Sequence, residues 1–386
     1  MSTIFHLDKQ LNMWDTNREQ VSERKEYKNM TGKERISRIL RHEPVDRIGL
    51  FEHFWNDTHK AWAKKGHIRE DECMADHFGY DLETCWAFDT TADLDFKEQV
   101  VEETEDTIVE KNGNYATLRY HKKHDTTPEH VDFDIKVAKD YYERIRPLLL
   151  PEERRIDMER YTEIKERAAK AERFFCLSGV NSFECMHPVC GHEHMLVGMA
   201  LEPEWIAEMA MDYAKLMVEL QKMLFKKCGK PDGIWFYEDM GFKERPFMSP
   251  QMYRELIFPA HKYTIDFAKS EGLPVIMHSC GFIEPLLPDM IEAGIDCLQV
   301  IEVKAGMDLL KIHKEFGDKI ALMGGIDVRA LYSNDKAIID AELEAKIPTV
   351  KNGYGFVLHS DHSIPETVDY ETYRYFIKKG LELGTY

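Results

Sequence analysis

The sequence predicts an α/β protein: a (β/α)8 TIM barrel with an N-terminal helical cap and an inserted β-hairpin. Short apolar runs bounded by turn residues recur eight times along the 386 residues, as expected of buried parallel strands. Most are followed by a stretch with apolar residues three and four positions apart, the pattern of an amphipathic helix. Eight strands alternating with helices is the count of a closed barrel, and no Pro/Gly linker divides the chain.

The predicted elements divide the chain into a cap and a barrel. Residues 1–45 are polar and charged, and the capping-box spacing of Thr31 and Glu34 opens a short helix from Arg35 to Arg41. Residues 46–386 form the predicted barrel domain. Its strands are expected at 47–54, 84–90, 174–180, 234–239, 274–279, 297–302, 320–325 and 355–360.

Helices and one insertion are expected between the strands. The clearest helical patterns run from Met252 to Lys269 and from Leu309 to Phe316. Between the second and third strands, residues 97–136 hold two alternating runs around Asn112-Gly113-Asn114. This pattern predicts a β-hairpin that lies outside the barrel.

Charge and composition argue against several classes of function. A formal net charge of −19 disfavours nucleic acid and anionic lipid as partners. No apolar stretch approaches the roughly eighteen residues of a membrane-spanning helix. Met1 to Arg18 lacks the apolar core of a secretory signal. Eight scattered cysteines without framework spacing indicate reduced thiols and a cytoplasmic location.

A possible metal site follows the fifth predicted strand. The apolar run Leu273 to Met277 leads directly into His278-Ser279-Cys280-Gly281. Since side chains alternate along a strand, His278 and Cys280 point the same way. Imidazole nitrogen and thiolate sulfur are ligands that Zn²⁺ prefers, and barrels keep their chemistry at the carboxyl ends of their strands.

The other late strands also end in polar residues, which converge on one rim in a barrel. Glu302 follows the sixth strand and His362 the eighth, so we expect His278, Cys280, Glu302 and His362 to bind zinc through N, S, O and N. Glu302 could leave the metal when substrate binds, or could instead pair with Lys304. His359 is an alternative to His362, with the other of the two lining the pocket.

Residues 185–194, Cys-Met-His-Pro-Val-Cys-Gly-His-Glu-His, also contain many potential ligands. Cys185 and Cys190 lack a second Cys/His pair at zinc-finger spacing, and Pro188 and Gly191 indicate a loop. We therefore predict a loop and a helix start here, with Glu184 and His187 lining the pocket because they follow the third strand.

The candidate ligands carry a family resemblance. A His-x-Cys, a Glu twenty-two residues beyond the Cys and a further ligand about eighty beyond it resemble the zinc site of cobalamin-independent methionine synthase. The wider sequence resembles the uroporphyrinogen decarboxylase-like superfamily, which includes the methylcobalamin:coenzyme M methyltransferases. The matching stretches are TGKERISRILRHEPVDRIGL, FYEDMGFKERPFMSPQMYREL, PVIMHSCGFIEPLLPDMIEAGIDCLQV, EVKAGMDLLKIHKEFGDKIALMGGIDVRAL and the SIP after His362.

Two departures from the family pattern bear on the chemistry. Uroporphyrinogen decarboxylases carry an arginine-rich segment after strand one, whereas residues 52–57 here are Glu-His-Phe-Trp-Asn-Asp, and 88–91 only faintly resemble the catalytic Asp loop. Thiol-alkylating relatives have Cys where this chain has His362. Replacing a thiolate by neutral imidazole makes the metal a stronger Lewis acid, which favours a methylated oxygen over a thiol as substrate.

The resemblance implies a zinc-dependent methyltransferase that moves a methyl group between a small methylated substrate and a corrinoid (methylcobalamin/cob(I)alamin). The chain has no Asp-x-His-x-x-Gly cobalamin signature, so the corrinoid is expected on a separate protein; a homodimer is an open alternative for the assembly. Glu238 and Asp239 are the expected catalytic residues, which position substrate or move a proton, unless they cap a turn. The expected substrate contacts are Phe54, Trp55, Trp86, Glu184, His187, Tyr237, Asp327 and His359.

Two other functions stay open on the sequence. A decarboxylase of the porphyrinogen type would need no metal but should need basic anchoring residues. A non-catalytic corrinoid- or substrate-binding relative would retain the fold with a degraded site.

Overall fold

The barrel is built from eight parallel strands. The computed structural model describes residues 30–124 and 126–386, and its main sheet has the order β1-β14-β13-β12-β11-β8-β7-β2. Every strand overlaps a predicted one, which confirms the (β/α)8 architecture. The strands are β1 Gly49–Leu50, β2 Leu82–Trp86, β7 Phe174–Val180, β8 Gly233–Tyr237, β11 Val275–Ser279, β12 Cys297–Val300, β13 Ala321–Gly324 and β14 Phe356–Leu358.

The first and last strands of that order, β1 and β2, meet through Leu50 and Asp81. The Asp81 N–H donates to the Leu50 carbonyl over 2.9 Å. The Leu50 N–H donates to the Asp81 carboxylate over 2.8 Å. These bonds draw the open edges of the sheet together, so its carboxyl ends form a continuous rim.

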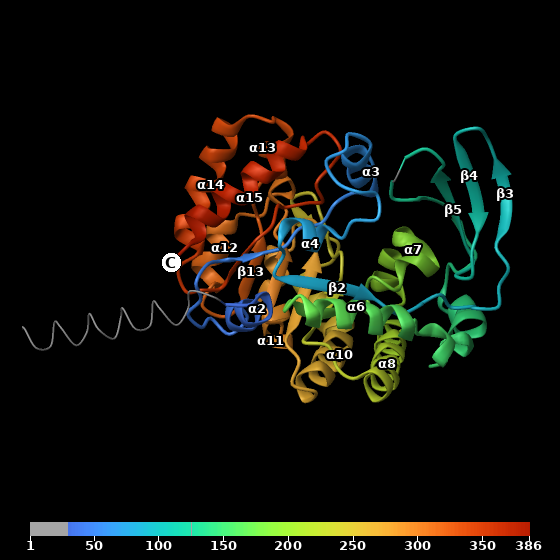
Figure 1. Cartoon of the computed structure of the whole chain (residues 1–386). Helices are drawn as coiled ribbons and strands as arrows, with labels where there is room; N and C mark the ends of the chain where they lie inside the picture. Colours follow the sequence, from blue (N-terminus) through green and yellow to red (C-terminus); the bar gives the residue numbers. More distant parts are fainter. Residues whose placement is uncertain (1–29, 125) are drawn as a thin grey trace, which may run out of the picture.

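Helices cover the outside of the sheet (Figure 1). The predicted helix Leu309–Phe316 is found with the same bounds, and the predicted helix from Met252 to Lys269 contains a π-helical turn at Tyr253–Ile257 before α10. The longer helices are α2 Gly32–Ile39, α3 Asn56–Lys64, α4 Met74–Phe78, α6 Met158–Lys170, α7 His187–Leu201, α8 Pro203–Cys228, α10 Phe258–Ser270, α11 Leu287–Ala293, α12 Leu309–Phe316, α13 Val328–Tyr332, α14 Lys336–Val350 and α15 Tyr370–Gly384. Within the described ranges, no helix combines the length and apolar character needed to cross a membrane.

The described part of the predicted cap is α2. The Thr31 side chain accepts a hydrogen bond from the Glu34 N–H over 3.1 Å, as the capping spacing predicted. The helix begins at Gly32, three residues before the predicted start, and ends at Ile39, two residues before the predicted end. Arg35 is buried and pairs with Asp46 and Asp81 at 2.6 Å each, which fixes α2 against the barrel. Residues 1–29 of the predicted cap lie outside the described residues.

The insertion is a four-stranded antiparallel sheet, larger than the predicted hairpin. Its strands lie in the order β3-β4-β5-β6, and the predicted turn at 112–114 joins β4 to β5. The outer strand β3 is exposed along its whole length. Its sequence therefore lacks the alternation of apolar and polar residues that predicts a half-buried strand. The bounds are β3 Gln99–Glu103, β4 Thr107–Lys111, β5 Ala116–His121 and β6 Glu129–Phe133.

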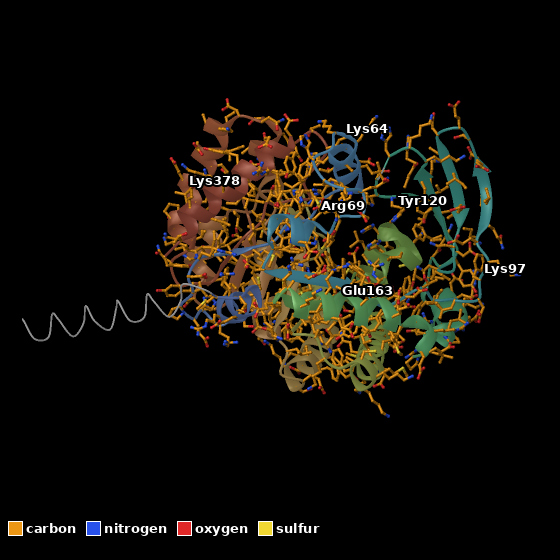
Figure 2. All side chains as sticks on the ribbon, in the orientation of Figure 1. Lys64, Arg69, Lys97, Tyr120, Glu163 and Lys378 are labelled. Carbon is orange, nitrogen blue, oxygen red and sulfur yellow. The ribbon has the colours of Figure 1, made fainter. Side chains whose placement is uncertain are left out.

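The inserted sheet lies on the far side of α7 from the barrel, with β5 and β6 against that helix (Figure 1). Lys97, next to β3, and Lys378, on α15, mark opposite sides of the molecule (Figure 2). Helix α7 therefore connects two packed parts of the chain, the barrel and the inserted sheet.

Candidate metal centre

Three potential ligands meet at the carboxyl end of β11. The Cys280 Sγ lies 3.4 Å from the Nε2 of His278, which confirms that the two side chains point the same way. Asp239, just after the neighbouring strand β8, places its Oδ1 3.2 Å from the same nitrogen. One ligand atom from each residue lies within 4.8 Å of the other two. We call this group, Asp239, His278 and Cys280, the Cys280 site.

A buried glutamine orients the His278 ring. The Nδ1–H of His278 donates to the Oε1 of Gln299 on β12. This bond turns Nε2 toward Cys280 and makes it the nitrogen that would bind a metal, which is how proteins usually orient a metal-binding imidazole. Gln299 is not among the site residues predicted from the sequence, although a polar residue inside the apolar strand Cys297–Val300 is itself a signal.

The electrostatics of the Cys280 site favour a cation. Burial alone lowers the pKa of His278, but the neighbouring Cys280 sulfur and Asp239 carboxylate outweigh burial and raise it well above its usual value. Burial raises the pKa of the Cys280 thiol, and the nearby His278 partly offsets this rise. Protons held in this way are released when a metal binds. A nitrogen, a sulfur and a carboxylate oxygen in a partly buried, negative site fit Zn²⁺.

Glu302 borders the site from behind the turn at Gly281. Its Oε2 accepts a hydrogen bond from the Gly281 N–H over 2.7 Å, and its Oε1 lies 3.5 Å from the Lys304 Nζ. A side chain at Gly281 would place Cβ 2.2 Å from the Gly241 backbone, at a φ of +82°, so the turn requires glycine. The predicted ion pair with Lys304 is thus present, while zinc ligation by Glu302 stays a prediction.

His362 follows β14, and its ring centroid lies 5.9 Å from that of Trp55. Burial lowers the pKa of His362; nearby Lys304 adds to this, and Glu302 opposes it. Its ligation also stays a prediction.

The alternative ligand His359 is fully buried behind the site. Its Nδ1–H donates to the Ser360 carbonyl over 2.5 Å, and its Nε2 accepts from Gln299 over 3.3 Å and from the His53 Nδ1–H over 3.0 Å. Burial lowers its pKa to about 3, so the ring is neutral. His359 supports Gln299, which in turn holds His278.

The two expected catalytic carboxylates point in different directions. Asp239 faces His278, and its backbone N–H donates to Glu184 over 3.1 Å. Glu238 is fully buried and accepts three hydrogen bonds, from the N–H groups of Phe183 and Glu184 at 2.9 and 2.6 Å and from the His261 Nε2 at 2.6 Å. These contacts position the loop after β7; a role of Glu238 in proton transfer remains a prediction.

Two of the predicted aromatic contacts form a wall beside the Cys280 site. The rings of Trp86 and Tyr237 lie 4.9 Å apart, and Tyr237 lies 4.7 Å from the His278 ring. Trp86 is 42% exposed, so its outer face is available to a ligand. The Tyr237 hydroxyl donates to the His53 Nε2 over 2.9 Å, which fixes the tilt of the phenol ring.

The remaining predicted contacts are more scattered. Phe54 packs edge-on against Trp62 and Tyr373 in an aromatic core beneath α3. Trp55 and Phe54 both line a cavity of about 320 Å³ beside β1 and β2. Asp327 caps α13 and pairs with Arg329 at 2.6 Å, an arrangement typical of an Asp at a strand end. The structure does not bring Asp327 into contact with the Cys280 site.

The comparisons with known proteins bear on the family and the fold. The family model for uroporphyrinogen decarboxylase (URO-D) matches residues 236–380. A methylated-thiol–coenzyme M methyltransferase of Methanosarcina mazei is 32% identical over 87 residues, a segment that spans 22% of this chain and 22% of that relative. A solved structure of a methyltransferase from Methanosarcina mazei superposes with a TM-score of 0.62 at 16% identity, over 92% of this chain and 99% of that one. Residues 236–380 thus match the uroporphyrinogen decarboxylase family, and the chain shares the fold of the superposed methyltransferase structure.

The residues that match the family model include the whole Cys280 site, and also Glu302 and His362. The inserted sheet and α7 lie outside the matched residues. Between Phe51 and Asp57 the chain has no Arg or Lys, and the buried Glu52 accepts hydrogen bonds from the backbone N–H and the hydroxyl of Ser360 at 2.9 and 3.1 Å. That end of β1 therefore offers no cationic clamp for a polycarboxylate.

Proposed function

We propose that the chain is a zinc-dependent methyltransferase. It would move a methyl group between a small methylated substrate, either a methyl ether such as a methoxyaromatic or a thiol, and a corrinoid carried by a separate protein. The convergence of His278, Cys280 and Asp239 on the barrel rim carries the proposal. The names of the Methanosarcina mazei relatives, both methyltransferases, support the reaction class.

The ligand residues determine what the site does to a substrate. Zinc, when bound, supplies a Lewis acid that stabilises negative charge on the substrate heteroatom. His278 and Cys280 would hold the ion, with Gln299 fixing the ring that donates to it. Asp239 lies within reach of the same position and can bind the ion or hold a proton near the heteroatom.

The wall of Trp86 and Tyr237 favours a flat substrate. An aromatic ring stacked on Trp86 would present a substituent toward His278, because Tyr237 lies between the two. The presence of His362 in place of a thiolate lowers the negative charge near the metal and so favours a methyl ether over a thiol. The absence of cations at residues 51–57 disfavours a porphyrinogen carboxylate.

The corrinoid would reach the rim on a partner protein. The sequence contains no Asp-x-His-x-x-Gly signature. Catalysis would then need a docked complex in which the partner presents its corrinoid to the open side of the Trp86–Tyr237 wall.

The test combines elemental analysis with a methyl-transfer assay. We expect purified protein to contain zinc, and a panel of methoxyaromatics, methylamines and thiols, assayed by methylcobalamin absorbance, to identify a methyl donor or acceptor. Cys280→Ala should lose both zinc and turnover, whereas Cys228→Ala, at the end of α8, should keep both. A metal-free protein with full activity would disprove the proposal.

A further inference from the structure

Three histidines meet between the inserted sheet and the barrel. His187 and His192 lie on α7 with ring centroids 4.3 Å apart, and His130 on β6 lies 5.9 and 5.5 Å from them. One nitrogen from each ring lies within 4.8 Å of the other two. We call these three residues the histidine cluster; it shares no residue with the Cys280 site.

A break in α7 creates this arrangement. In a regular helix, residues five positions apart point about 140° away from each other. Gly191, with φ 70° and ψ 157°, interrupts the helix between His187 and His192 and turns the second ring onto the first. A Cβ at Gly191 would lie 2.6 Å from the Phe133 ring of β6, so glycine also allows the inserted sheet to approach.

The orientation of His187 is that of a metal ligand. Its Nε2–H donates to the Glu184 carboxylate over 2.8 Å. In the neutral ring Nδ1 then carries the lone pair, and this atom is buried without a hydrogen-bond partner among the described residues. A carboxylate that binds one ring nitrogen while the other is left free is the usual support for a ligating histidine. An unsatisfied buried acceptor is otherwise costly.

The other two rings also suit a ligand role. Burial lowers the pKa of His192 to about 4, with contributions from His187 and His130, and burial lowers the pKa of His130. Neutral rings can lie together without repulsion, and neutral imidazole is the form that binds metal.

We infer that His130, His187 and His192 bind a second divalent transition-metal ion, which ties the inserted sheet to α7. Three imidazoles suit zinc, copper and nickel, and three protein ligands leave a position for water or an anionic group. With metal–nitrogen bonds of about 2.0–2.1 Å, ligand nitrogens lie about 3.4 Å apart. The rings must therefore rotate out of their stack and close from the present spacing, a shift that the exposed strand β6 can accommodate.

The histidine cluster lies on the same rim as the Cys280 site. The Asp239 carboxylate interacts electrostatically with both His187 and His278. An ion in the cluster would thus add positive charge beside the proposed substrate position, although the inference itself does not depend on the proposed function.

The experiment is a zinc titration of chelator-treated full-length protein by calorimetry, with bound metal counted by elemental analysis. We expect two zinc ions per chain in the unmodified protein and one in Cys280→Ser. We also expect one in the double variant His130→Gln/His187→Gln, and none when all three changes are combined. His194→Gln, on the same helix, should keep two.

Cobalt substitution identifies which ion is which. In Cys280→Ser the remaining Co²⁺ should show ligand-field absorption without a sulfur-to-cobalt band, and in the double histidine variant the sulfur band should remain. Unchanged circular dichroism of the metal-free variants establishes that they fold.

Each outcome decides the inference. Loss of all zinc in Cys280→Ser, or two ions in the double histidine variant, would overturn it. If the unmodified protein binds a single ion that gives no sulfur-to-cobalt band, and Cys280→Ser keeps that ion, the result would support the histidine cluster while refuting the proposed function.

Discussion

The Cys280 site and the histidine cluster differ in how their residues are brought together. At the Cys280 site, the ligands lie at the carboxyl ends of the neighbouring parallel strands β8 and β11, so strand alternation and the barrel rim fix their positions. The histidine cluster joins one residue of an antiparallel insertion to two residues across a broken helix. Periodicity in a sequence can therefore reveal the first kind of site but not the second.

The sharpest way to break this comparison is to remove a ligand from the Cys280 site alone. We expect His278→Ala to lower kcat/KM for methyl transfer by about 10³-fold, since it removes the proposed metal ligand that Gln299 orients. Zinc bound at the histidine cluster should be unaffected. Steady-state kinetics with elemental analysis measure both effects, and a variant with unchanged kcat/KM would place the chemistry elsewhere.

The region behind the Cys280 site should also carry a pH dependence. Burial raises the pKa of Glu52 from 4.5 to about 8, so the folded protein holds a proton that the unfolded chain releases. The stability of the protein should therefore fall as pH rises from about 4.5 to about 8. Glu52→Gln should remove on the order of 2–4 kcal/mol of this decline. Urea unfolding at pH 5 and pH 8 measures the free energy of unfolding of both proteins. An equal loss of stability between the two pH values in the unmodified protein and in Glu52→Gln would contradict the assignment.

Glu238 links the barrel strands to the region of the histidine cluster. It directly follows β8, and it accepts hydrogen bonds from the loop that leads into α7. In Glu238→Gln the amide NH₂ group would face hydrogen-bond donors that now bind the carboxylate. We expect this change to lower the free energy of unfolding by about 2–3 kcal/mol. Glu163→Gln, an exposed change on α6 (Figure 2), is the control and should alter stability by under about 0.5 kcal/mol. Equal denaturation midpoints for the two variants would show that the buried contacts contribute little.

Gly191 sharpens the comparison from the other side. Gly191→Ala should cost about 1–2 kcal/mol in folding free energy, because alanine is strained at positive φ and meets Phe133. It should weaken zinc binding at the histidine cluster while leaving methyl transfer within about threefold of the unmodified protein. Calorimetric titration of the Cys280→Ser background isolates this effect, and unchanged affinity would mean that the kink does not form the cluster.

The sequence predicted the barrel and part of its chemistry for physical reasons. Apolar runs located all eight strands because both faces of a parallel strand are buried. The same alternation placed His278 beside Cys280, and it could have separated Glu238 from Asp239, since neighbouring residues on a strand point to opposite sides. The supporting role of Gln299 depends on a side-chain hydrogen bond across strands, which no local pattern encodes.

The insertion marks where sequence prediction was weakest. The hairpin around 112–114 was expected from its turn residues, but β3 and β6 are largely exposed and charged and lack an apolar signature. The histidine cluster needs both β6 and the Gly191 kink, so the ligand-rich segment 185–194 alone gave no reason to expect a third imidazole.

The most direct test of the account is the zinc K-edge X-ray absorption of the zinc-loaded protein. The account predicts a sulfur scatterer at about 2.3 Å together with nitrogen or oxygen at about 2.0–2.1 Å, and loss of the sulfur shell in Cys280→Ser. A spectrum of the unmodified protein with nitrogen and oxygen scatterers but no sulfur shell would contradict a zinc ion held by Cys280.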